Sequence, residues 1–289
     1  MCDEFTAVAE DAALASQGVT RRAFAALGSA AALAACSGPS KGQTSSLTES
    51  TVRIPTPDGS ADAFFVHPAK GKYPGVVLWP DVGGLRDAMM VMARQLAGSG
   101  YAVLVVNQYY RGAAAPVITS FSEWRTAEGQ ARLQPLIAAI NAEGTTRDAA
   151  AFAGFLDGQA PVDKARKIGT QGYCMGGAFA MRTAAAIPGR VGAAASFHGG
   201  GLASDKPDSP HLLLPGTQAS YLIAVAQNDD AEDPAEKERF RTAAAAAGRP
   251  AEIEVYPADH GWCVPDTPVY DQAQAERAWG RLLALYAKL

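Results

Sequence analysis

The chain has no run of about 18 strongly apolar residues, the length that a membrane-spanning helix requires. It also has no marked excess of charge, because 25 Lys and Arg accompany 29 Asp and Glu, for a net charge of −4. We therefore expect neither nucleic acid nor an anionic membrane surface as a partner. Only four cysteines and four histidines occur in 289 residues, and no Cys-x-x-Cys or His-Glu-x-x-His spacing is present. The sequence thus predicts no metal site, and it carries no phosphate-binding or dinucleotide fingerprint.

The first 36 residues resemble a bacterial export signal. Arg21 and Arg22 precede a weakly hydrophobic stretch over residues 23–35, the order found in twin-arginine signals. Residues 33–36, Leu-Ala-Ala-Cys, then resemble a lipobox, in which the cysteine is lipidated and begins the mature chain. The alternative is a short alanine-rich helix. We expect an exported, periplasmic protein that contacts a membrane only through a lipid on Cys36.

Two further segments follow this signal. Residues 37–50 are rich in Ser, Gly, Thr and Lys, which predicts a flexible tether. Residues 51–289 are expected to form one domain, because we find neither an internal repeat nor a second core. With 48% hydrophobic residues, the chain can form a large core. We take the protein to be a monomer.

Within residues 51–289, apolar runs of strand length alternate with segments of helical spacing. Continuous apolar runs are typical of strands buried on both faces of a parallel sheet. Two strands are expected around a turn at residues 58–59, and residues 107–143 read as loop and short helices over a site. This alternation predicts an α/β fold with a mostly parallel sheet, helices on both faces and a minimal cap. The predicted strands are 75–79, 101–106, 167–171, 191–197, 220–226 and 251–256, and the helices are 87–97, 146–157, 178–187, 234–247 and 272–288.

The turn between the strand at 167–171 and the helix at 178–187 carries Cys174 between Gly172 and Gly176. A strand, a tight glycine-flanked turn with a nucleophile at its apex, and a helix form the nucleophile elbow of α/β-hydrolases. Glycines flank the nucleophile because its backbone is strained and neighbouring side chains would collide with the strand and the helix. The alternative is a small buried cysteine without a chemical role.

Reactive side chains follow three of the predicted strands. Cys174, then Asp229 or Asp230, and then His260 each come directly after a strand. In open α/β sheets, ligands bind at the carboxyl ends of the strands, and nucleophile, acid, histidine is the α/β-hydrolase order. A cysteine attacks as thiolate, a histidine moves its proton, and a carboxylate orients the imidazole. His198 also ends a strand, and we interpret it as structural or pocket-lining.

These motifs resemble the dienelactone hydrolase family. The resemblance rests on Gly-x-Cys-x-Gly-Gly at residues 172–177, an aspartate after a later strand, and His-Gly-Trp at residues 260–262, and it covers residues 51–289. It implies an α/β-hydrolase that hydrolyses enol-lactones or other small esters without a cofactor. By this resemblance Cys174 is the nucleophile and His260 the base.

Two aspartates compete for the third position of the triad. Asp229 matches the small-x-x-Asp pattern of the family, which implies that it orients the base. Asp230 is the alternative, because a proline often follows the family's acid by four residues and Pro234 stands four residues after Asp230.

The resemblance also implies further site residues. The backbone N–H groups of Val82 and Met175 would form the oxyanion hole. The family carries a glutamate beside the first of these, which pairs with the resting thiol; Asp81 stands there in this chain, one methylene shorter, and is predicted to line the site. Arg111 matches a family arginine that binds the carboxylate of the lactone, a task suited to a guanidinium fork.

The sequence therefore predicts hydrolysis of a small ester or lactone through an acyl-thioester on Cys174. One alternative is a non-catalytic envelope protein that keeps the fold and binds a ligand. A disulfide between Cys174 and Cys263 would favour that alternative, because it would block the nucleophile. A thioesterase or acyltransferase using the same triad is a further possibility.

Overall fold

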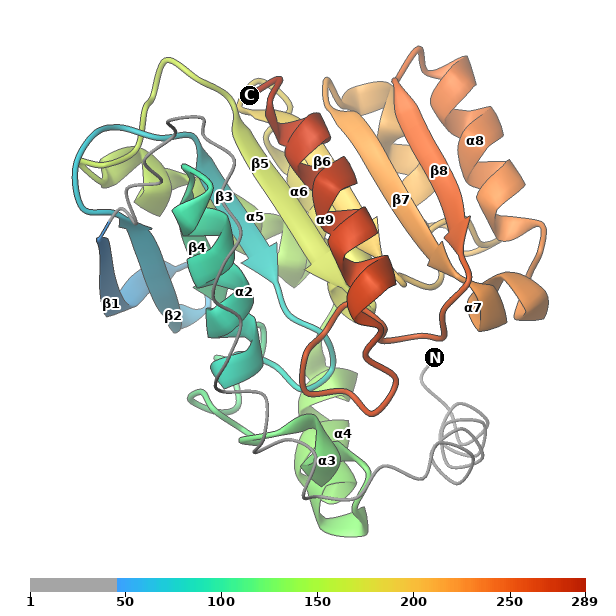
Figure 1. Cartoon of the computed structure of the whole chain (residues 1–289), viewed down its shortest axis with the longest axis horizontal. Coiled ribbons are helices and arrows are strands. Elements are labelled where there is room, and N and C mark those ends of the chain that lie inside the picture. Colours follow the sequence, from blue (N-terminus) through green and yellow to red (C-terminus); the bar gives the residue numbers. More distant parts are fainter. Residues whose placement is uncertain (1–45) are drawn as a thin grey trace, which may run out of the picture.

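A computed structural model describes residues 46–289, which form an eight-stranded sheet in the order β1-β2-β4-β3-β5-β6-β7-β8 (Figure 1). Strand β2 pairs antiparallel with β1 and with β4, and the six strands from β4 to β8 pair in parallel. The strands are β1 (Leu47–Thr56), β2 (Gly59–Pro68), β3 (Gly75–Trp79), β4 (Ala102–Val106), β5 (Ile168–Tyr173), β6 (Val191–Phe197), β7 (Ser220–Ala226) and β8 (Ala251–Tyr256).

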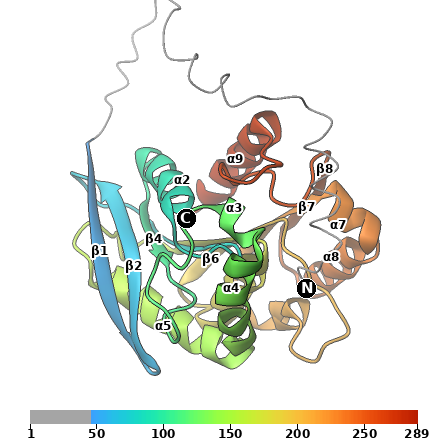
Figure 2. The ribbon, with the colours of Figure 1, turned by 90° about the horizontal axis from the view of Figure 1, so that it is seen from below.

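Helices cover both faces of this sheet (Figure 2). Helices α2 (Asp87–Gly98) and α9 (Gln272–Tyr286) pack on one face, and α5 (Ala142–Gly158), α6 (Met175–Ala186) and α8 (Glu236–Ala246) pack on the other. Each face has its own buried core, because the side chains of a strand alternate between the two sides of the sheet. The predicted α/β-hydrolase architecture, a mostly parallel sheet between two layers of helices, is confirmed.

Residues 107–141 contain two helices, α3 (Phe121–Trp124) and α4 (Ala127–Ala139), which lie beyond the carboxyl ends of the strands (Figures 1 and 2). A small separate cluster of Tyr109, Ile118 and Leu133 is buried beneath them. The expectation of loop and short helices over this edge agrees with the structure. Two other short elements, 3₁₀ helix η1 (Pro210–Gly216) and α7 (Gln227–Glu232), were not predicted.

Two boundaries differ from the sequence-based expectation. Strand β1 begins at Leu47 and pairs with β2 along ten residues, so the last four residues of the expected tether belong to the sheet. Helix α5 begins at Ala142, earlier than expected, because Asn141 rather than Thr145 or Thr146 caps it: the Asn141 side chain accepts a hydrogen bond from Gly144 N at 2.8 Å. The expected export signal over residues 1–36, with Cys36, and residues 37–45 of the tether lie outside the described residues.

The turn from β5 into α6 brings backbone against backbone. A Cβ on Gly172 would lie 1.9 Å from the carbonyl oxygen of Gly176, and one on Gly176 would lie 2.4 Å from the carbonyl oxygen of Trp79. Neither contact can relax by moving a side chain, because both partners are main-chain atoms. Glycine at these positions lets the first turn of α6 rest on the end of β3.

Replacing Gly176 with alanine should therefore destabilise the protein by about 3 kcal/mol, since the added methyl group must displace the backbone of β3. Gly280→Ala in α9 is the matched control, because a Cβ there meets no atom within 4 Å. The free energy of unfolding of that control should rise by about 0.5–1 kcal/mol, because alanine favours the helix more than glycine does. Urea unfolding of both variants measures the difference, and equal stability would contradict the close approach.

Candidate active site

Cys174 occupies the apex of the turn between β5 and α6. Its φ is 53° and its ψ is −125°, an arrangement that costs a non-glycine residue about 1–3 kcal/mol. Two acceptors hold its N–H, the carbonyl of Phe197 at 3.0 Å and Nδ1 of His198 at 3.1 Å. Its carbonyl accepts from Gly177 N at 3.0 Å. The strained backbone is thus anchored to the end of β6 and to the first turn of α6.

His260 lies in the loop after β8 and contacts Asp229 at the start of α7. Its Nδ1 is 2.8 Å and 3.0 Å from the two carboxylate oxygens, and its backbone N–H donates to Asn228 Oδ1 at 2.8 Å. Because a carboxylate only accepts, Nδ1 carries the hydrogen, and Nε2 of the neutral ring has the lone pair that a base needs. Asp230 instead pairs with Lys237. Of the two candidate aspartates, the structure brings Asp229 to the histidine.

The two peptide groups on either side of Val82 are held by side chains that follow β4. Gln108 Nε2 donates to the carbonyl of Asp81 at 2.7 Å, and the Tyr109 hydroxyl donates to the carbonyl of Val82 at 2.8 Å. In a planar trans peptide the N–H points opposite to the C=O, so fixing the Asp81 carbonyl also fixes the Val82 N–H. The Tyr109 hydroxyl lies 3.5 Å from Met175 Sδ as well, which ties together the two predicted oxyanion residues.

Sequence reasoning missed both Gln108 and Tyr109. They directly follow a buried strand at the carboxyl edge of the sheet, the same position that singled out Cys174 and His260. Position at that edge was therefore a usable signal, although neither side chain belongs to a recognised catalytic motif.

Asp81 belongs to a buried ion cluster. Arg86 donates to both of its carboxylate oxygens, at 2.6 Å and 3.0 Å, and Gly83 N donates to the first of them at 2.8 Å. The same guanidinium donates to Asp266 at 2.8 Å and 2.7 Å. Asp266 also accepts from the N–H of Phe121, at the start of α3, at 2.9 Å.

This cluster joins three separate parts of the site. Asp81 precedes Val82, the predicted oxyanion residue, Asp266 follows His260 by six residues, and α3 begins the small cap. The side chain of Arg86 is completely buried. Burial opposes its charge, but Asp81 and Asp266 outweigh that effect and raise the pKa of the guanidinium above its ordinary value. Arg86 was not identified from the sequence.

Arg111 points toward the edge of the sheet. It donates to Asp148 on α5 at 2.8 Å from each of two nitrogens, and to Asp58 at 2.6 Å and 3.0 Å. Asp58 lies in the turn between β1 and β2, whereas Cys174 follows β5, three strands away from β2 in the sheet. The guanidinium is thus occupied by two carboxylates. The substrate-binding roles of Asp81 and Arg111 stay predictions, and neither enters the function proposed below.

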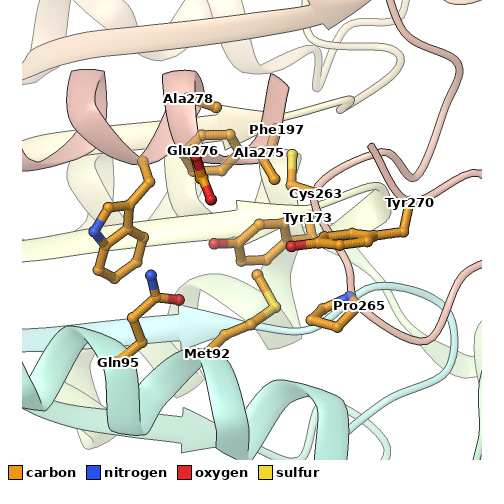
Figure 3. A pocket seen from close by; sticks show the side chains of 11 residues that line it. Met92, Gln95, Tyr173, Phe197, Cys263, Pro265, Tyr270, Ala275, Glu276 and Ala278 are labelled. Carbon is orange, nitrogen blue, oxygen red and sulfur yellow. The ribbon is translucent and has the colours of Figure 1, made fainter. Parts of the chain in front are cut away.

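Cys263 is buried on the face of the sheet that α2 and α9 cover. It lines a pocket between α2 and α9 with Tyr173, Met92 and Trp279 (Figure 3). Burial raises the pKa of its thiol well above the ordinary value, which makes it a poor nucleophile. No disulfide joins Cys174 and Cys263.

Within residues 46–289, no three His, Cys, Asp or Glu side chains are grouped so that they could hold a metal ion. Over the same part of the chain, no helix has the combined length and apolar character needed to cross a membrane.

Replacing Arg86 with methionine should destabilise the protein by about 3–5 kcal/mol, because two carboxylates would lose their buried counter-charge. Arg94→Met is the control. Arg94 makes an equally bidentate contact with Glu49, at 2.8 Å and 2.9 Å, but at the surface, where such a pair contributes about 0–1 kcal/mol. Unfolding in guanidinium chloride measures the change in stability of both variants. Similar losses of stability would contradict the importance of burial.

Comparison with known proteins finds relatives that share one provisional name. A protein of Methylorubrum extorquens, provisionally named carboxymethylenebutenolidase, is 26% identical over 275 residues, which covers 91% of each chain. A Salmonella typhi protein with the same provisional name is 25% identical over 81% of this chain and 85% of its own. Both names denote a hydrolase, and the chain is a hydrolase of this type.

Solved structures share the fold. A provisionally assigned dienelactone hydrolase from Klebsiella pneumoniae superposes with a TM-score of 0.73 at 22% identity, over 84% of this chain and all (100%) of that one. The dienelactone hydrolase-like promiscuous phosphotriesterase P91, from metagenomic libraries, gives 0.68 at 22% identity, over 84% and 98%. The sequence profile of the dienelactone hydrolase family matches residues 61–289. The chain therefore belongs to the dienelactone hydrolase family.

Proposed function

We propose that this protein hydrolyses a small ester or lactone with Cys174 as nucleophile, His260 as general base and Asp229 as the acid that orients it. The observation that carries the proposal is the contact of His260 Nδ1 with both oxygens of Asp229, on a chain whose elbow holds a cysteine at positive φ. A histidine held in this way is the base that a nucleophilic thiol requires.

In the first half of the reaction His260 Nε2 takes the thiol proton, and Cys174 Sγ attacks the carbonyl carbon. The carbonyl oxygen becomes an oxyanion that the N–H groups of Val82 and Met175 stabilise. Met175 is the first residue of α6, so its N–H has no acceptor within the helix. The C–O bond then breaks, the leaving oxygen takes the proton from His260, and an acyl-thioester stays on Cys174.

In the second half, water attacks the thioester carbon while His260 takes one of its protons. The same amides hold the second oxyanion. The C–S bond breaks, the carboxylic acid leaves, and the proton on His260 returns to the sulfur. Asp229 stabilises the imidazolium that forms in each half. No step needs a metal or an organic cofactor.

The alternative of a non-catalytic binding protein rests on the expected export, because a catalytic thiol is poorly protected outside the cytoplasm. A disulfide between Cys174 and Cys263 would favour this alternative. No disulfide joins the two cysteines, and Cys263 lines a pocket between α2 and α9, so the structure offers no support for that bond. No observation favours a thioesterase or an acyltransferase over an ester hydrolase.

Replacing Cys174 with alanine should abolish turnover of p-nitrophenyl acetate. Asp229→Asn should lower kcat on the order of 10³-fold, because the imidazole loses its orienting charge. Asp230→Asn is the matched control: it changes the neighbouring aspartate, which pairs with Lys237, and should leave kcat near that of the wild type. Stopped-flow burst kinetics measure all three variants. Turnover retained by Cys174→Ala, or a larger loss in Asp230→Asn than in Asp229→Asn, would reject the assignment.

For localisation we propose export and lipid anchoring at Cys36, on the order of paired arginines, apolar stretch and Leu-Ala-Ala-Cys. In a bacterial host the full chain should sediment with membranes, and Cys36→Ala should shift it away from the membrane fraction because the acyl chains are lost. Mass spectrometry of the native N-terminus provides the direct reading. An intact, unlipidated residue 1 in the wild type would refute the proposal.

A further inference from the structure

We infer that His198 is a positioning residue for the proposed reaction: its neutral imidazole holds the backbone of the nucleophile and packs against the ring of the base. The inference rests on the function proposed above. The sequence alone suggested only a structural or pocket-lining histidine at this position.

His198 lies between the strands that lead to Cys174 and to Asp229. It directly follows β6, which stands between β5, the strand that leads to Cys174, and β7, the strand that leads to Asp229. Its own N–H donates to Ala224 O on β7 at 2.8 Å. Its φ of 41° lies outside the range of a β-strand. The residue is 1% exposed.

One hydrogen bond defines the state of the ring. The N–H of Cys174 donates to His198 Nδ1 at 3.1 Å, so Nδ1 carries no hydrogen and Nε2 carries one. Burial lowers the pKa of His198 well below its ordinary value, and the nearby His260 lowers it further, which keeps the ring neutral. Protonation would place a hydrogen on Nδ1, which would then face the N–H of Cys174 as a donor and break this contact.

The same ring packs against the base. Its centroid is 4.7 Å from that of His260, edge to face, and 5.3 Å from that of Trp262. A neutral neighbour at this distance lets His260 become charged during the reaction without like-charge repulsion, whereas a protonated His198 would oppose it. The imidazole of His198 thus contacts both partners of the proton transfer.

Stability does not explain a histidine at this position. Its Nε2–H is buried and finds no hydrogen-bond partner among residues 46–289. A buried donor without an acceptor costs free energy, and an apolar side chain of similar size would avoid that cost. The Cys174 N–H would also keep a second acceptor, the carbonyl of Phe197. The polar ring is therefore better explained by its contacts with Cys174 and His260.

Three substitutions test the inference on the full-length reduced protein. His198→Leu removes the acceptor and the unpaired donor together. His198→Asn can place an oxygen near the former Nδ1, and asparagine tolerates positive φ. His198→Gln carries its amide farther out, near the former Nε2. These three separate the bond to Cys174 from the presence of a polar group.

We expect His198→Leu to unfold at the same temperature as the wild type or higher, with kcat for p-nitrophenyl acetate lowered about tenfold to a hundredfold and KM nearly unchanged. His198→Asn should recover part of kcat, and His198→Gln should not. The pH dependence of iodoacetamide alkylation should show a shifted thiol pKa for Cys174 in the leucine and glutamine variants. A purely structural residue would give a lower unfolding temperature and an unshifted thiol.

Controls separate this inference from the function on which it depends. His211→Leu removes a histidine that contacts Ser209 outside the site, and it should leave kcat unchanged. If Cys174→Ala retains turnover, the proposed function fails. If Cys174→Ala is inactive but His198→Leu keeps the wild-type kcat, only the positioning role is overturned. Should the leucine variant fail to fold, equal kcat in the asparagine and glutamine variants overturns it.

Discussion

The backbone of Cys174 is the constraint on which the candidate site depends. A left-handed residue at the end of a buried strand is unfavourable, and it persists only where neighbouring structure holds it. Here the parallel pairing of β5 with β6 supplies the acceptors for its N–H, and glycines allow α6 to approach the end of β3. The backbone of Cys174, the proposed nucleophile, is therefore held by several elements of the sheet and not by its own turn alone.

The loops that carry Val82 and His260 are held by ion pairs as well as by packing. Arg86 joins the loop of Val82 to the loop of His260 through two carboxylates, in a place where its side chain has no contact with water. Breaking such a cluster leaves an uncompensated buried charge, so its members act as one unit. The loop of Val82 and the loop of His260 are thereby held in a fixed position relative to each other.

Different kinds of contact thus hold the three partners of the proposed reaction. Backbone hydrogen bonds hold Cys174, a carboxylate holds the His260 ring, and side chains following β4 hold the peptides on either side of Val82. His198 stands where these parts meet, in contact with Cys174 and His260. Such preorganisation is what stabilises a developing oxyanion without reorganisation during the reaction.

The sequence by itself determined the alternation of strands and helices, the turn around Cys174 and the order of cysteine, aspartate and histidine, because these depend on local periodicity and on glycines at defined spacing. Only the tertiary structure decided which aspartate contacts His260, that Arg86 neutralises Asp81, and that Arg111 faces Asp58 and Asp148. It also decided that His198 contacts both Cys174 and His260. These contacts join residues far apart in the chain or select between adjacent ones. The spacing of residues in one sequence does not reveal the direction in which a side chain on a loop points.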